Sequence, residues 1–255
     1  MAKKDKNAER DERRARIERM RRDQQRAERR RTLLVVAVCV VIALVIVSLT
    51  GWQLWQDREA DQEAQGTPLD ELGVSADAAG CADLLTEPGD GSAEHIAEGA
   101  IEYANAPPAF GAHRPAPVEF GRKFYEIADR PEVEQLVHNL EHGYTILWYD
   151  QTVADDADEL AAVEDIATKF EGNADLGTPE YDAGKFIAAP WTSDDGEPFP
   201  DGAHVALTHW AAEGDDAAEG QGMGAWSYCD QPSGEAVADF MAEFPPTNAM
   251  EPGAL

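Results

Sequence analysis

The sequence predicts a single-pass N-terminal transmembrane helix followed by one compact extracytoplasmic α+β domain. Three observations lead to this fold class. Residues 33–49 form an apolar run of 17 residues without a charged side chain. The segments on either side of that run carry opposite net charges. Beyond residue 92, strand-like and helix-like stretches alternate, and the connections between them are long and rich in Pro and Gly.

Residues 32–54 are expected to cross the lipid bilayer, so the chain has the bilayer as a binding partner. About 20 apolar residues, each rising ~1.5 Å, span a hydrocarbon core of ~30 Å. A cleaved signal peptide is the alternative, but its apolar part usually has ~7–15 residues and precedes a small-residue cleavage site. Here the run is longer and bulky residues such as Trp52 follow it, which favours an uncleaved anchor.

Charge sets the orientation of this anchor. Residues 1–31 contain 14 Lys/Arg and 7 Asp/Glu, a net charge of +7, whereas residues 57–255 contain 7 Lys/Arg and 43 Asp/Glu, a net charge of −36. A basic flank stays in the cytoplasm, so we expect a cell-membrane protein with a cytoplasmic N-terminus and an extracytoplasmic C-terminal domain. The acidic domain repels phosphates, which argues against nucleic acid as a partner. The basic tail is expected to be solvated, with contact to anionic lipid headgroups as the alternative.

The chain after the anchor divides into a polar linker at residues 55–91 and a domain at residues 92–255. Gly66 and Pro68 end any helix that leaves the membrane. In the first half of the domain we expect a short element at 93–103, an ordered loop with four Pro at 105–117, a strand at 122–127, a helix at 131–142 and a strand at 144–149. The helix has Pro131 in its first turn and Gly143 just past its end.

The second half of the domain continues this alternation. Residues 155–170 have the pattern of an amphipathic helix with acidic residues in its first turn, where the helix dipole favours them. Residues 185–189 and 204–210 each combine β-branched and aromatic residues with other apolar ones, which predicts strands. Residues 233–244 predict a helix that Ser233 caps. His204 and His209 are expected to pack or to face solvent.

Cysteine usage fits the expected compartment. Cys39 lies inside the apolar run, so Cys81 and Cys229 are the two cysteines outside it. Extracytoplasmic space is usually oxidising, and an even number of cysteines permits one bridge. We therefore expect a Cys81–Cys229 disulfide, with two unrelated thiols as the alternative.

The strongest chemical pattern is His138-Asn139-Leu140-Glu141-His142-Gly143. On a helix, positions i, i+3 and i+4 share one face, so His138, Glu141 and His142 would project together. Two imidazoles and a carboxylate can hold a divalent metal. The same His-x-x-Glu-His spacing occurs in one class of zinc hydrolase, which is a minor alternative. That class needs another protein ligand. The downstream candidates Glu213 and Glu219 lie in a Gly/Asp/Ala-rich loop, which is poorly suited to hold a ligand rigidly.

Three blocks of the sequence resemble a bacterial family called domain of unknown function 3105. They are PPAFGAHRP at 107–115, LVHNLEHGYTILWY at 136–149 and EPGA at 251–254. The resemblance covers residues 92–255 and implies an N-terminal anchor with one outer domain, but no established activity. The matching positions outside the helix motif are His113 and the structural positions Pro107, Pro108, Gly111, Gly143, Trp210 and Glu251. His95 resembles a His-x-x-Glu-Gly element that opens the family's domain.

The chain departs from the family pattern at three places. His209 stands where Ala is more frequent, and Met250 stands where Pro is usual. A Cys that family members often carry after the first motif is absent, which excludes a thiolate role there. The chain also has no Gly-x-Ser-x-Gly, no Gly-rich phosphate loop and no Cys-x-x-Cys.

Two functions from different classes follow. The first is a membrane-anchored extracytoplasmic protein that binds a transition metal, zinc or copper, for storage, delivery or metal-dependent chemistry, with the ligands His113, His138, Glu141 and His142. The second is a non-catalytic interaction or assembly module with a protein partner in the cell envelope. In that case the same side chains only hold the Pro-rich loop against the helix. The sequence assigns no catalytic residue and favours a role other than that of an enzyme.

Overall fold

The computed structural model describes residues 66–171 and 184–253, together with residues 20, 40, 42–48 and 52, which are helical. The chain divides into two units, residues 1–59 and 60–255. Within the described residues, every helix falls short of the length and apolar character that crossing a membrane requires. The predicted tail at 1–31 and the start of the linker lie almost entirely outside the described residues, and so does more than half of the predicted span at 32–54.

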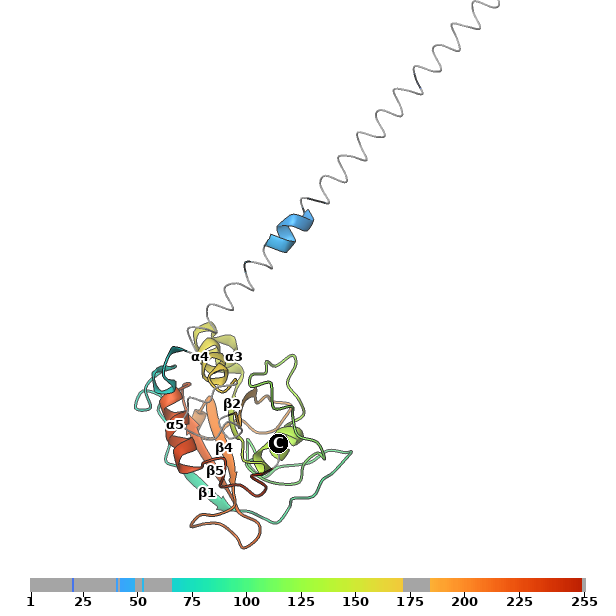
Figure 1. The fold of residues 1–255 in the computed structure, drawn as a ribbon. Coiled ribbons are helices and arrows are strands. Elements are labelled where there is room, and N and C mark those ends of the chain that lie inside the picture. Colours follow the sequence, from blue (N-terminus) through green and yellow to red (C-terminus); the bar gives the residue numbers. More distant parts are fainter. Residues whose placement is uncertain are drawn as a thin grey trace, which may run out of the picture. The chain divides into compact units, whose positions relative to one another are not determined.

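The second unit is a compact α+β domain around a mixed sheet, which confirms this part of the predicted fold class (Figure 1). The strand order is β1-β5-β4-β2-β3. Strands β2 and β3 are parallel, and the other neighbours are antiparallel. The strands are β1 (Leu85–Pro88), β2 (Thr145–Tyr149), β3 (Phe186–Pro190), β4 (Val205–Ala211) and β5 (Met223–Cys229).

The parallel pair needs a crossover connection, and two helices lie in its first half. They are α3 (Gln151–Asp155) and α4 (Ala157–Thr168), where the sequence predicted one helix from residue 155. The division comes from Asp156, which is extended at φ −101° and ψ 113°. Its carboxylate accepts hydrogen bonds from the first turn of α4, so this residue ends one helix and caps the next.

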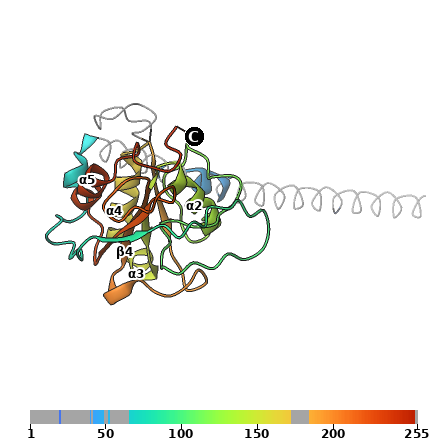
Figure 2. The ribbon, with the colours of Figure 1, turned by 90° about the horizontal axis from the view of Figure 1, so that it is seen from below.

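Helices cover both faces of the sheet, and α5 and α2 lie on opposite sides of it (Figure 2). One core packs α4 and α5 (Gly234–Glu243) against strand residues that include Leu147, Leu207 and Ala225. The other packs α2 (Val133–Glu141) and irregular segments against the alternate strand residues, among them Trp148 and Trp226. Two short 3₁₀ helices, Leu69–Glu71 and Pro200–Gly202, complete the described elements.

Several predicted elements are irregular in the structure. Residues 93–103 contain one isolated bridge, between His95 and His113, and residues 122–127 contain one bridge, between Phe124 and Ala188. The second segment pairs briefly with β3 and then turns away, because the Glu126 N–H donates to the Asp129 carboxylate. Strands β1 and β5 were not predicted.

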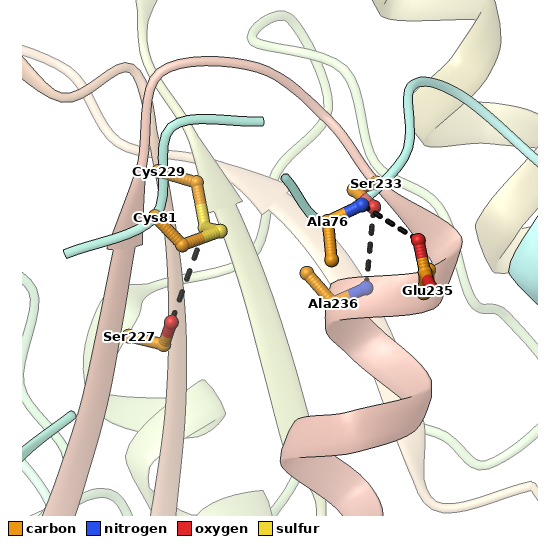
Figure 3. Close-up of a disulfide and its surroundings, with 7 residues drawn as sticks. All are labelled: Ala76, Cys81, Ser227, Cys229, Ser233, Glu235 and Ala236. Atoms are coloured by element: carbon orange, nitrogen blue, oxygen red, sulfur yellow. Dashed lines mark hydrogen bonds between the residues drawn. A yellow bond between two sulfur atoms is a disulfide. The ribbon is translucent and has the colours of Figure 1, made fainter. Parts of the chain in front are cut away.

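Two features hold the segment before β1 against the end of the sheet (Figure 3). A disulfide joins Cys81 to Cys229, the last residue of β5, with the Cα atoms 3.9 Å apart. The Ala76 N–H donates to the Glu235 carboxylate at 2.8 Å, in the first turn of α5. Ser233 caps the same helix, as predicted, by accepting a hydrogen bond from the Ala236 N–H. The segment at residues 76–81 is thus held at both ends.

Candidate metal centre

Two buried histidines, a half-exposed histidine and a carboxylate meet where the irregular segment before α2 contacts that helix. His95 and His113 lie next to each other through a parallel bridge, in which the Ile96 N–H donates to the His113 carbonyl at 2.8 Å. His138 and Glu141 come from successive turns of α2. One ligand atom from each of these four residues lies within 4.8 Å of the ligand atoms of the other three.

The Pro-rich loop that carries His113 is fixed to the sheet. The indole Nε1 of Trp226 donates to the Pro107 carbonyl at 2.8 Å, and Pro107 and Pro108 are buried. Gly111 has a φ of +135°, which L side chains rarely adopt, so the loop can turn there and direct His113 inward. The His113 ring is fully buried, with its centroid 6.1 Å from that of Trp210.

Two side chains tie this loop to α2. The amide of Asn139 pairs with the backbone of Val118, accepting from its N–H at 2.8 Å and donating to its carbonyl at 3.2 Å. The guanidinium of Arg114 donates to Glu132 at 2.6 Å and to the carbonyls of Ile96 and Gly99. Arg114 therefore links the segment of His95, the loop of His113 and the start of α2.

Backbone hydrogen bonds determine which ring nitrogens of the two buried histidines face the cluster. Nδ1 of His113 lies 2.8 Å from the Gly111 carbonyl, and Nδ1 of His138 lies 2.6 Å from the Arg114 carbonyl. A carbonyl only accepts, so each Nδ1 carries the proton and each neutral ring keeps its Nε2 lone pair. Metal-binding histidines are typically oriented in this way, with the second nitrogen donating to a carbonyl or carboxylate.

The contact between His113 and Glu141 joins two acceptors. Nε2 of His113 lies 3.1 Å from Oε2 of Glu141, although a neutral His113 and an ionised Glu141 both present lone pairs there. A proton or a cation between them removes the conflict. Burial alone would lower the pKa of His113, but the hydrogen bonds to Glu141 and Gly111 outweigh it and raise this pKa. Without a metal ion, the pair is therefore best satisfied by a proton on His113.

The neighbouring groups shift in the complementary directions. Burial would raise the pKa of Glu141, but the hydrogen bond from His113 and the nearby histidines lower it. Burial lowers the pKa of His138, and the charges of His113 and His142 lower it further. His138 is therefore the neutral imidazole beside an ionised Glu141, and a metal ion would also have to displace the proton between Glu141 and His113.

The dimensions and donor set of the cluster fit a transition metal ion. Three imidazoles and one carboxylate suit Zn(II) or Cu(II). Bonds of ~2.0–2.1 Å place tetrahedral ligand atoms ~3.3 Å apart, so closure of this set requires inward shifts of less than ~1 Å. The side chain of His95 is 50% exposed, while that of Glu141 is 9% exposed. The cluster therefore opens to solvent on the His95 side.

The fourth predicted ligand, His142, lies in an adjacent group instead. Ligand atoms of Glu141, His142 and Glu251 also lie within 4.8 Å of one another. His142 is the C-cap of α2, and its Nδ1 lies 3.4 Å from the Glu251 carbonyl and 3.9 Å from the Glu251 carboxylate. Lys185 links the two segments of this group, because its Nζ donates to the carbonyls of His142 and Pro252, each at 2.6 Å.

The remaining histidines lie elsewhere. His204 pairs with Asp150 at 2.9 Å. His209 is fully buried against the α5 face of the sheet, stacked on Phe244, with its ring nitrogens 3.1 and 2.8 Å from the carbonyls of Tyr144 and Asn248. Gly143 has a φ of +87° just after α2, the conformation that glycine favours at this position.

The sequence did not place His95, Arg114, Asn139 and Lys185 in the site, and it predicted Glu251 only as a structural position. His95 carried a signal in the His-x-x-Glu-Gly element, but no spacing connected it with His113. Asn139 lies within the helix motif itself. Arg114 and Lys185 act on backbone carbonyls far away in sequence, which leaves no local pattern.

Comparison with known proteins gives one match. The family described as "Protein of unknown function (DUF3105)" matches residues 95–254, a span that begins at His95 and includes both groups of candidate ligands. No curated protein and no solved structure matches the chain.

Proposed function

Since the chain belongs to the DUF3105 family of proteins of unknown function, we propose a function from its own side chains: it is a membrane-anchored extracytoplasmic protein that binds a transition metal ion, zinc or copper. The ligands are His95, His113, His138 and Glu141. This set replaces His142 of the sequence-based proposal with His95, because His95 shares the cluster with the other three ligands.

The orientation of the buried imidazoles is the observation that carries this proposal. Both Nδ1 atoms donate to backbone carbonyls, so His113 and His138 keep Nε2 available beside a carboxylate. A purely structural histidine is most stable when each ring nitrogen has a complementary partner, so that the N–H faces an acceptor and the lone pair faces a donor. Nε2 of His113 instead faces another acceptor, Glu141, and a divalent cation satisfies both.

The proposed location rests on the sequence and on the disulfide. Residues 32–54 have the length and composition of a membrane anchor, and the basic residues before them favour a cytoplasmic N-terminus. A Cys81–Cys229 bridge suits an oxidising compartment. The metal site is then on the outer side of the membrane, where ions exchange through the exposed side of His95. We propose reversible binding, for storage or delivery.

Elemental analysis tests the proposal. The full chain is purified in detergent through a tag without histidine, from cells supplied with zinc and copper, and its metal content is compared with that of His113→Ala and His138→Ala. We expect close to one tightly bound ion per chain in the wild type and a loss of at least tenfold in each variant. His204→Ala is the matched control, because its ring pairs with Asp150 outside the cluster.

Thermal unfolding separates a metal site from a structural cluster. If an ion binds, zinc or copper raises the melting temperature of the wild type and a chelator reverses the rise, while His138→Ala responds to neither. The proposal is overturned if the wild type holds no metal and neither ion changes its melting temperature. The histidines would then only hold the loop to the helix, as the interaction-module alternative requires.

A further inference from the structure

We propose that the centre holds two divalent ions, with the Glu141 carboxylate as the bridge between them. The first ion has the ligands His95, His113 and His138, and the second has His142 and Glu251. This inference rests on the proposed function, because it adds a second position to the same centre. Its starting observation is that Glu141 belongs to both groups of converging ligand atoms.

A carboxylate is suited to this shared position. It has two oxygens with separate lone pairs, so each oxygen can bind a different ion. In two-metal sites of proteins the ions lie ~3.5–4 Å apart and act together on one bound group. Oε2 of Glu141 already lies 3.1 Å from His113 and 3.7 Å from His95. The ring centroids of His138 and His142, one from each group, are 4.6 Å apart.

The backbone holds His142 and Glu251 together independently of any contact between their side chains. The Glu251 N–H donates to the Glu141 carbonyl at 2.9 Å, which fixes the C-terminal segment to the end of α2. The buried Lys185 adds the second connection by donating to the carbonyls of His142 and Pro252. The Glu251 carboxylate is thus placed at the cluster by main-chain hydrogen bonds.

The side chains themselves are not paired closely. Nδ1 of His142 and the nearest carboxylate oxygen of Glu251 are 3.9 Å apart, which is too long for a hydrogen bond. The Glu251 side chain is 60% exposed, whereas that of His142 is 7% exposed. An exposed carboxylate at the rim, a buried imidazole and a shared carboxylate form an open site for an ion that enters from solvent.

The two positions differ in donor type. The first offers three nitrogens and one oxygen, and the second offers one nitrogen and two carboxylates. Carboxylate oxygens favour harder ions than imidazole does, so the second position is expected to bind zinc more weakly and to accept Mn(II). Loading is therefore expected in two steps as the free metal concentration rises.

Zinc titration of the full chain in detergent tests the bridge, with bound zinc counted by elemental analysis after free ions are removed at each concentration. We expect two zinc ions per chain in the wild type and one in Glu251→Ala, a change at a largely exposed side chain that leaves the main-chain hydrogen bonds in place. The exposed Glu243→Ala is the matched control and should retain two.

The outcomes separate this inference from the proposed function. One zinc per chain at saturation in the wild type, unchanged in Glu251→Ala, would overturn the second position and leave the first intact. No zinc in either protein would overturn both. Two zinc ions in Glu251→Ala would place the second ion elsewhere and also overturn the bridge.

Loading with Cu(II) tests the bridge itself. Two Cu(II) ions ~3.5–4 Å apart interact magnetically, so the electron paramagnetic resonance lines of the fully loaded wild type should be broadened and those of Glu251→Ala should not. A spectrum of two isolated copper ions in the fully loaded wild type would refute a shared Glu141.

Discussion

Replacing Glu141 with glutamine should remove metal binding without weakening the metal-free fold. In the metal-free protein, the Glu141 carboxylate faces Nε2 of His113 at 3.1 Å and needs a proton there. A glutamine amide of the same shape can donate to that nitrogen, so the buried contact stays satisfied. The change should therefore alter the free energy of unfolding of the metal-free protein by no more than about 1 kcal/mol.

The effect on the metal-bound protein should be much larger. The substitution removes the anionic ligand of the cluster, for which we expect at least a ~100-fold loss of zinc affinity. At a free zinc concentration 100 times the wild-type Kd, zinc stabilises the wild type by about 2.7 kcal/mol, but a variant that binds ~100-fold more weakly gains only about 0.4 kcal/mol. For a domain of this size, these values correspond to rises in melting temperature of about 5–11 °C and about 1–2 °C.

The assay is thermal unfolding of both proteins with zinc and with chelator, and Glu243→Gln, at an exposed position of α5, is the control. An equal rise in melting temperature for the wild type and Glu141→Gln would refute the role of Glu141 as a ligand. A drop of several degrees in Glu141→Gln with chelator present would refute the hydrogen-bond argument and show that the charge of Glu141 supports the fold.

Three further predictions concern the fold. Burial lowers the pKa of His209 to about 4, so this histidine is neutral in the folded protein but takes up a proton below about pH 6.5 when the chain is unfolded. The contribution of the neutral His209 to the free energy of unfolding is fully present above about pH 6.5 and is lost as the pH falls towards 4. Between pH 7 and 5, with chelator present, His209→Gln should therefore lose about 2 kcal/mol less than the wild type in urea unfolding, and parallel curves would contradict this. Gly143→Ala puts a Cβ 2.3 Å from a backbone carbonyl at a φ of +87°, so its melting temperature should fall by at least about 4 °C, whereas Gly121→Ala, in open space, should match the wild type. Replacing Cys81 and Cys229 with serine opens a bridge between residues separated by 148 positions, which should cost about 2–5 kcal/mol in denaturant unfolding without loss of metal; a metal-free variant would link the bridge to the site.

Local patterns predicted the regular elements near the site. Gly143 and the β-branched run after it place the end of α2 and the start of β2, because each signal acts within a few residues. Pro131 was expected in the first turn of α2 but lies just before its N-cap, Glu132. Strand β5 was missed, since its Met-Gly-Ala start has little intrinsic strand preference. It is stabilised by pairing with β1 and β4 on both sides, which no local window contains.

The composition of the cluster could also be predicted only in part from local patterns. Helical spacing placed His138, Glu141 and His142 on one face, and in the structure the ring centroids of His138 and His142 are 4.6 Å apart. The spacing could not show that Glu251 lies beside His142, which puts this histidine in the second group. His95 joins the cluster through one backbone bridge to His113 in an irregular segment. Such a register follows from tertiary packing and not from periodicity.

The candidate ligands are spread along the sequence from His95 to Glu251, and the Glu251 N–H is bonded to the end of α2. Both proposed groups are complete only when the chain has been made as far as Glu251, whereas the four ligands of the first position all precede residue 142. Filling of the second position would therefore require the segment that contains Glu251. In the proposed topology this happens after export, so the ions would come from outside the membrane, and the supply of cytoplasmic metal would not decide which ion the protein receives.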